Sequence, residues 1–129
     1  MIDSSQDAVF NLRKTDDKNI NKNVSALLIE QEKVLGVYVT VRDQVVFTNM
    51  RIITIDVQGI TGVKQDITSF PYSRIQYYAV QTAGLLELIP DCELALYFNN
   101  GFRAIFEFKG SCDILEIGKA ISRYALTNF

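Results

Sequence analysis

The chain has 129 residues, a formal net charge of −2 and no histidine. A chain of this length forms one ordinary domain whose core needs no disulfide or metal. The net charge gives the molecule as a whole no attraction to a phosphate backbone or an anionic membrane, so nucleic acid is not an expected partner.

The first 24 residues are mostly polar, with Val9, Phe10 and Leu12 as a short apolar island. We interpret residues 1–24 as a mobile arm and residues 25–129 as the folded domain. No basic segment leads into an apolar run, so no signal peptide is expected, and no apolar run is long enough to span a membrane. These features predict a cytoplasmic protein. From Asn23 to Glu32, helical spacing of apolar residues predicts a short helix.

Strand patterns and turn signals alternate from residue 33 onward. Residues 33–41 and 45–48 are predicted strands, and residues 48–51 are a predicted tight turn. In residues 53–57, Ile53, Ile55 and Val57 alternate with polar residues and predict the next strand. The QGITG segment at 58–62 carries two glycines and predicts a hairpin turn. Pro71 interrupts the following strand, and a new strand is expected near Ile75.

A hairpin over residues 92–108 allows a choice between two registers. A two-residue turn at Asn100-Gly101 would mix core and solvent positions, whereas a three-residue loop, Asn99-Asn100-Gly101, makes one face wholly apolar. We therefore predict the three-residue loop, with Glu93 opposite Glu107. The pairs on the apolar face are then Phe98 with Phe102, Leu96 with Ala104, Leu94 with Phe106 and Cys92 with Phe108.

A helix is predicted after Gly110. Asp113 and Glu116 have the spacing of a capping box, and Ile114, Ile117 and Ile121 recur on one face.

The succession FTNMRIITID, QGITG, FPYSRI and QTAG resembles the bacterial pleckstrin-homology-like (PH-like) domains, a family of unknown function, from Glu32 to the C-terminus. Two positions depart from that pattern: Gln31 stands where glycine is expected, and Met50 where a basic residue is expected. The resemblance implies a mainly β fold, a PH-like barrel of two nearly orthogonal antiparallel sheets capped by the C-terminal helix. It also implies ring-forming homo-oligomers built from the barrel sheets.

Catalytic chemistry is not expected from these residues. Without histidine the chain lacks the most usual general base, and no serine, threonine or cysteine lies in a nucleophile motif. Cys92 and Cys112 are the only cysteines, which favours small buried apolar residues in a reducing compartment over a metal site. We predict no catalytic residue, cofactor or metal.

A lipid-headgroup site is the alternative function. Phosphoinositide-binding PH domains use clustered basic residues on the first hairpin, where this chain has only Lys33 and Arg42. A weaker candidate for an anion patch is a second basic group on the central strands: Arg51, Lys64 and Arg74.

Self-association is the favoured function. Several apolar or aromatic residues fall on strand positions that alternation turns away from the core, and either the N-terminal segment of the same chain or a second subunit must cover them. We therefore predict a non-enzymatic module that binds itself through strand faces and edges and mediates contacts with other proteins. The interface candidates are Tyr38, Ile52, Ala95, Tyr97 and Ile105. Val46 shows the same pattern, and the pair Tyr77-Tyr78 puts an aromatic residue on both faces of its strand.

Overall fold

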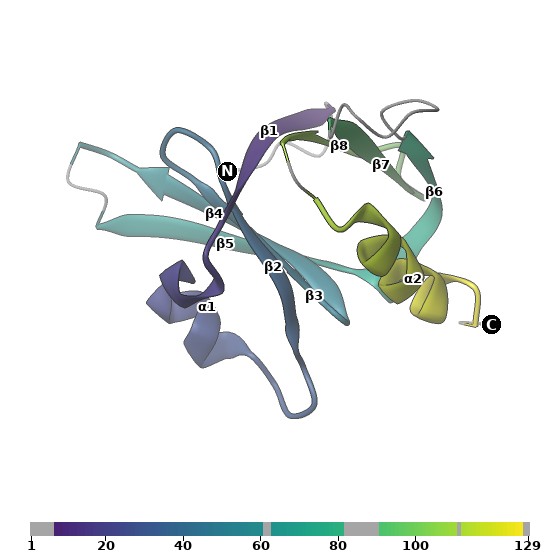
Figure 1. Ribbon diagram of the computed structural model, residues 1–129, viewed down its shortest axis with the longest axis horizontal. Coiled ribbons are helices and arrows are strands. Elements are labelled where there is room, and N and C mark those ends of the chain that lie inside the picture. The colour runs from purple at the N-terminus through teal and green to yellow at the C-terminus, as the bar shows by residue number, and fades with distance from the viewer. Residues whose placement is uncertain (1–6, 61–62, 82–90, 111, 128–129) are drawn as a thin grey trace.

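The computed structural model describes residues 7–60, 63–81, 91–110 and 112–127. These residues form one mainly β fold (Figure 1). No helix in this part of the chain is both long and apolar enough to cross a membrane. The elements are β1 (Ala8–Thr15), the 3-10 turn η1 (Asp17–Asn19), α1 (Lys22–Leu27), β2 (Val34–Val39), β3 (Gln44–Thr48), β4 (Arg51–Gln58), β5 (Lys64–Pro71), the 3-10 turn η2 (Tyr72–Arg74), β6 (Ile75–Gln81), β7 (Cys92–Phe98), β8 (Arg103–Lys109) and α2 (Ile114–Ala125).

The strands form a single curled sheet in the order β5-β4-β3-β2-β1-β8-β7-β6. We call β2 to β5 the first half-sheet and β6 to β8 the second half-sheet. β1 joins them, since it pairs antiparallel to β2 and parallel to β8. The predicted PH-like barrel with a C-terminal helix is confirmed, and its two sheets are continuous through β1 (Figure 1).

The N-terminal segment is part of the fold, so the interpretation of residues 1–24 as a mobile arm is wrong for residues 8–24. β1 pairs with two strands, and Leu12 on its inner face is fully buried. η1 and α1 follow directly, with Asp16 and Asn21 as their N-caps. The segment is polar because alternate positions of β1, such as Asn11 and Arg13, face solvent.

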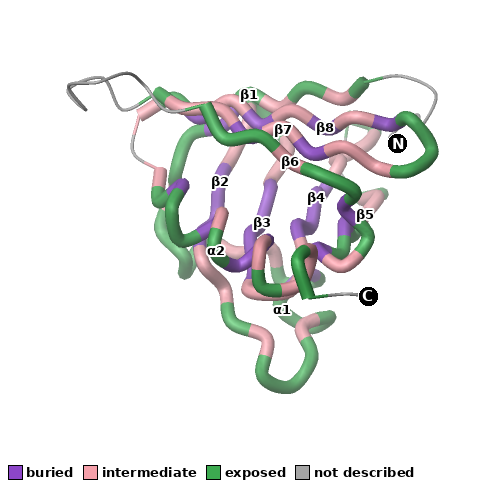
Figure 2. The backbone as a smooth tube through the Cα atoms, turned by 90° about the vertical axis from the view of Figure 1, so that its right-hand side faces the viewer, coloured by how far each residue is buried: buried purple, intermediate pink, exposed green. Residues whose placement is uncertain are grey.

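In the first half-sheet, strands β2, β3 and β4 are buried on both faces. Inside the barrel, residues such as Phe47 join the main core. On the opposite face, α1 places Val24 against Val37 and Ile53, which belong to a second buried cluster. Figure 2 shows buried residues concentrated on β2, β3 and β4, whereas β6 is largely exposed. Apolar residues therefore occupy both faces of the central strands, as expected for strands covered on both sides.

The hairpin of β7 and β8 has the predicted three-residue loop. Phe98 and Phe102 close it by a hydrogen bond from the Phe98 amide to the Phe102 carbonyl, at 3.1 Å. Gly101 has φ +85°, a left-handed conformation that glycine adopts without steric cost. The predicted pairing of Leu94 with Phe106 and the like-charge pair of Glu93 with Glu107 are both present.

The remaining turns and the last helix also match the sequence pattern. η2 interrupts the chain after Pro71, and β6 begins at Ile75. In the hairpin between β4 and β5, Gly59 has φ +76°, while Thr61 and Gly62 lie outside the described residues. Asp113 caps α2 by accepting a hydrogen bond from the Glu116 amide, and one helix face packs against η2 and β6. That face buries Ile114, Ile117, Ala120 and Ile121.

Candidate functional site

An apolar row crosses the outer face of the second half-sheet and β1. The register places Val9 beside Ile105, Ile105 beside Ala95, and Ala95 beside Ala79. Val9 is 53% exposed, and none of the other three side chains is fully buried. Four strands thus present one continuous line of apolar side chains outside the barrel.

A second row of this face is aromatic and charged. Tyr77 and Tyr97 are register partners, and their rings stack with centroids 4.2 Å apart. Arg103 lies over the ring of Tyr97 at 5.9 Å and pairs with Asp7 at 2.6 Å. Because Tyr77 remains 56% exposed, the stacked pair is available to a partner. We call these two rows the outer face: Val9, Tyr77, Ala79, Ala95, Tyr97 and Ile105.

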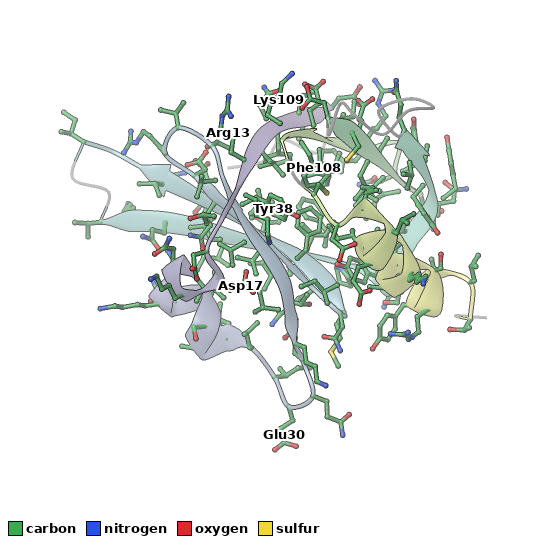
Figure 3. The ribbon with its side chains drawn as sticks, viewed as in Figure 1. Arg13, Asp17, Glu30, Tyr38, Phe108 and Lys109 are labelled. Carbon is green, nitrogen blue, oxygen red and sulfur yellow. The ribbon has the colours of Figure 1, made fainter. Side chains whose placement is uncertain are left out.

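Three of the five interface candidates, Ala95, Tyr97 and Ile105, come together on the outer face. The other two do not, so their assignment as outward-facing residues is corrected. Tyr38 is 1% exposed and Ile52 is fully buried, both in the main core. Figure 3 shows Tyr38 and Phe108 beside each other in the interior, where their ring centroids are 5.1 Å apart. Alternation failed here because β2 and β4 are apolar on both faces.

The basic group does not converge on one anion site. Arg51 is opposite Pro71 at one end of the β4–β5 ladder, and Lys64 is opposite Gln58 at the other. Seven residue steps separate the two ends, which is about 24 Å along a strand. Arg74 is exposed in η2.

Arg51 is also committed to a structural ion pair. Its Nε donates to Glu32 Oε2 and its Nη2 to Glu32 Oε1, both at 2.9 Å. The Glu32 side chain is fully buried, and Thr48 Oγ1 donates a third hydrogen bond to it at 2.7 Å. Burial alone would raise the pKa of Glu32, but the hydrogen bonds from Arg51 and Thr48 outweigh burial and lower this pKa below its ordinary value of 4.5. The pair therefore holds the start of β2 against the β3–β4 turn.

The family pattern places a glycine before Glu32, and the backbone conformation at that position explains why. Gln31 occupies that position with φ +67°, in the left-handed region that favours glycine. The Asn49 side chain donates to the Gln31 carbonyl at 3.1 Å and fixes this turn.

The two cysteine thiols are not activated as nucleophiles. Burial raises the pKa of Cys112 to about 12 and also raises that of Cys92, so both are protonated at neutral pH, and a protonated thiol is a poor nucleophile. In the described part of the chain, no group of three or more histidine, cysteine, aspartate or glutamate side chains could hold a metal ion.

Sequence reasoning missed Val9 and Ala79 as members of the outer face. The signal for Val9 was present, because Phe10 and Leu12 lie one strand repeat apart and leave Val9 on the other side. The signal for Ala79 depends on the register of β6, which is irregular between Ile75 and Tyr77.

Known proteins are similar to this chain in sequence and in fold. A family model described as bacterial PH domain matches residues 4–125. The uncharacterized protein YjqA of Bacillus subtilis is 36% identical over 105 residues, which is 80% of this chain and 82% of that protein.

Two solved structures agree with this assignment. A DUF1696 family protein with a pleckstrin-homology domain from Shewanella loihica is 31% identical, with a TM-score of 0.67 over 90% of this chain and 98% of that one. A pleckstrin homology domain from Shewanella amazonensis is 38% identical, with a TM-score of 0.53 over 80% and 82% of the two chains. A fold of this kind is in general a non-catalytic binding or interaction module. The family match over nearly the whole chain, supported by these relatives, means that this protein belongs to the bacterial PH domain family.

Proposed function

We propose that this protein is a non-enzymatic, cytoplasmic module that associates with copies of itself through the outer face and forms a closed, ring-like homo-oligomer. The observation that carries the proposal is the continuous apolar row on that face, next to the exposed Tyr77–Tyr97 stack. Contiguous apolar surface of this kind marks an interaction site in proteins that are otherwise polar outside.

The contrast between the two half-sheets supports this choice of surface. α1 covers the outside of the first half-sheet and buries Val46 and Ile55 completely. Among the described residues, the outside of the second half-sheet has no such cover, and Val9 and Tyr77 are each more than half exposed. A subunit of the same protein would remove this surface from water.

The composition of the outer face also fits an interface between proteins. Its centre is apolar and aromatic, and charged residues flank it: Arg103 with Asp7 on one side, and Glu93 with Glu107 on the other. An apolar centre with a polar rim is the usual anatomy of protein interfaces, and tyrosine is enriched among the residues that contribute most to binding.

Closure follows from the type of contact. If the outer face meets a different surface of its neighbour, each subunit presents one surface of each kind. Such an arrangement either closes into a ring or grows into a filament, and a protein that stays in solution favours the ring.

Multi-angle light scattering over a range of concentrations tests the proposal. For a subunit of 14.6 kDa, we expect a discrete mass larger than that of a dimer. Replacing Tyr97 with Glu and Ile105 with Lys should lower the mass to that of one subunit, because both side chains point outward and the core is unchanged. Ile60→Lys is the matched control, since Ile60 is a fully exposed apolar residue in the β4–β5 connection and its replacement should leave the mass unaltered.

The outcomes separate the parts of the proposal. A monomeric wild type at micromolar concentration would overturn self-association, and a dimer would overturn the ring. If the double variant lost its cooperative unfolding transition, the outer face would be part of the core and the assignment of faces would be wrong.

A further inference from the structure

A groove of about 600 Å³ lies between α2 and β6, on a surface different from the outer face. Its strand wall is formed by Tyr78 and Val80, which point to the same side of β6, toward the helix. Figure 1 shows α2 lying along β6 at this edge of the molecule. The groove is lined by Tyr78, Val80, Ile114, Leu115, Gly118, Lys119, Ser122, Arg123, Leu126 and Thr127.

The helix wall of the groove is a second stripe of α2, which shares only Ile114 with the buried face that closes the barrel. Leu115, Ser122 and Leu126 recur at helical spacing, and Leu115 and Leu126 are each 70% exposed. Leu126 lies eleven positions after Leu115, a distance of about 16 Å along a helix. An extended segment of about five residues has this length. The exposed leucines therefore bracket a site for a short extended peptide.

The groove is open beside Gly118. A Cβ atom added at Gly118 would meet no atom within 4 Å. The wall is fixed in place by Tyr78, whose hydroxyl lies in hydrogen-bond contact with the Ser122 hydroxyl and 3.4 Å from the Gly118 carbonyl oxygen. The strand wall and the helix wall are thus joined at Tyr78.

β6 is an edge strand, and this decides how a peptide would bind. It pairs with β7 on one side only, so alternate backbone amides and carbonyls along its other side have no strand partner in the described sheet. An extended peptide can satisfy these groups by adding a strand, while alternate side chains enter an adjacent pocket.

The charges at the groove select the peptide. Lys119 and Arg123 both line it, and none of the lining residues that the structure describes is acidic. Among the described residues neither has an ion-pair partner. Both lie in the C-terminal half of α2, where basic side chains also interact favourably with the helix dipole. A peptide with carboxylates beside its apolar residues would match this surface.

We propose that the groove binds an extended peptide segment of another protein, about five residues long, with alternating apolar side chains and flanking acidic residues. The peptide adds to the free edge of β6, places its apolar side chains between Leu115 and Leu126, and pairs its carboxylates with Lys119 and Arg123. This site shares no residue with the outer face, so it does not depend on self-association.

Fluorescence anisotropy with two labelled decapeptides tests the proposal. Both carry the core Leu-Thr-Val-Thr-Leu, one with flanking glutamates and the other with flanking lysines. We expect the acidic peptide to bind at least about tenfold more tightly and to weaken with added salt. In nuclear magnetic resonance spectra, the shifted amides should belong to β6 and α2, and those of β1 should not move.

Two variants make the assignment specific. In the Gly118→Leu variant, the new side chain should fill the groove and point away from the core, so peptide binding should be abolished. The smaller side chain of Gly118→Ala should reduce binding less. Replacing both Lys119 and Arg123 with Glu should reverse the preference in favour of the lysine-flanked peptide. Circular dichroism and light scattering of each variant show whether fold and mass are retained.

The proposal is overturned if neither peptide binds at about 1 mM, if both bind equally, or if the folded Gly118→Leu variant binds like the wild type. A fall in oligomer mass on adding peptide would show that a second copy of this protein occupies the groove. That result would also overturn the proposal. Binding by a monomeric wild type would support the groove while rejecting the proposed self-association.

Discussion

Removing the carboxylate of Glu32 should destabilise the fold by about 3 kcal/mol. Glu32 accepts two hydrogen bonds from Arg51, one from Thr48 and one from the Ile29 amide, and its side chain is fully buried. Breaking a buried ion pair by deleting one partner costs about 3–5 kcal/mol, because the remaining charge is left without compensation. The lower end applies to Glu32→Ala, since Arg51 is 21% exposed and keeps its bonds to Ser69 and the Leu27 carbonyl.

Urea unfolding followed by circular dichroism measures this loss. Arg51→Ala should cost more than Glu32→Ala, because it leaves the fully buried carboxylate unpaired. The double variant removes both charges and should therefore be more stable than the sum of the two single losses predicts, by at least about 1 kcal/mol. Losses that add to within about 0.5 kcal/mol would refute the ion pair as the source of the stability.

The Glu32–Arg51 ion pair should also make the free energy of unfolding depend on pH. The pKa of Glu32 is lowered by folding, so its contribution is complete above the ordinary value of 4.5 and is lost as the pH falls through the folded-state value. The stability difference between wild type and Glu32→Ala should therefore shrink on acidification. A difference that grew below pH 4.5 would show that the pKa is raised instead.

Three further expectations follow from the fold. Phe106→Ala should lower the free energy of unfolding by about 3–5 kcal/mol, because Phe106 is fully buried and stacks on Phe10 at 5.0 Å; a loss below about 1 kcal/mol in urea unfolding would contradict the hairpin register. Gln31→Gly should stabilise the protein by up to about 1 kcal/mol by relieving the left-handed conformation, and thermal unfolding with Gln31→Ala as the control would show this gain only for glycine. Liposomes containing phosphatidylserine or phosphoinositide should not co-sediment with the protein at physiological salt, since Arg51 is paired and Lys64 lies at the far end of its ladder; salt-sensitive binding would restore the lipid alternative.

The β7–β8 hairpin and the last helix could be predicted because their signals come from residues close together in the sequence. Only one register of β7 against β8 fits both the turn at Gly101 and the alternation of Leu94, Leu96 and Phe98. Asp113 marks the start of α2. These features involve residues close together in the chain, so pattern and structure coincide. Ala95, Tyr97 and Ile105 were found for the same reason.

The errors arose where distant segments decide burial. Tyr38 and Ile52 were assigned outward because alternation permits one buried face, and only the packing of α1 shows that β2 and β4 have two. Arg51 looked available because its partner Glu32 is 19 residues away. The pairing of β1 with β8 joins Ala8 to Ala104, and no local pattern reveals a contact over that separation.

The position of β1 has a consequence for how the chain folds. Since β1 lies between the two half-sheets, the sheet is complete only when the first strand has met the last one, 96 residues later in the sequence. Contacts between residues so far apart slow folding, because the entropy of a long loop is lost before the pairing stabilises it. During synthesis, β2 to β5 can pair as they emerge, but Leu12 and Phe10 stay without their partners on β8 until residue 109 has left the ribosome. Joining of the two halves by β1 is thus expected as the late, rate-determining event, and substitutions in β1 should slow refolding more than those in the β4–β5 hairpin.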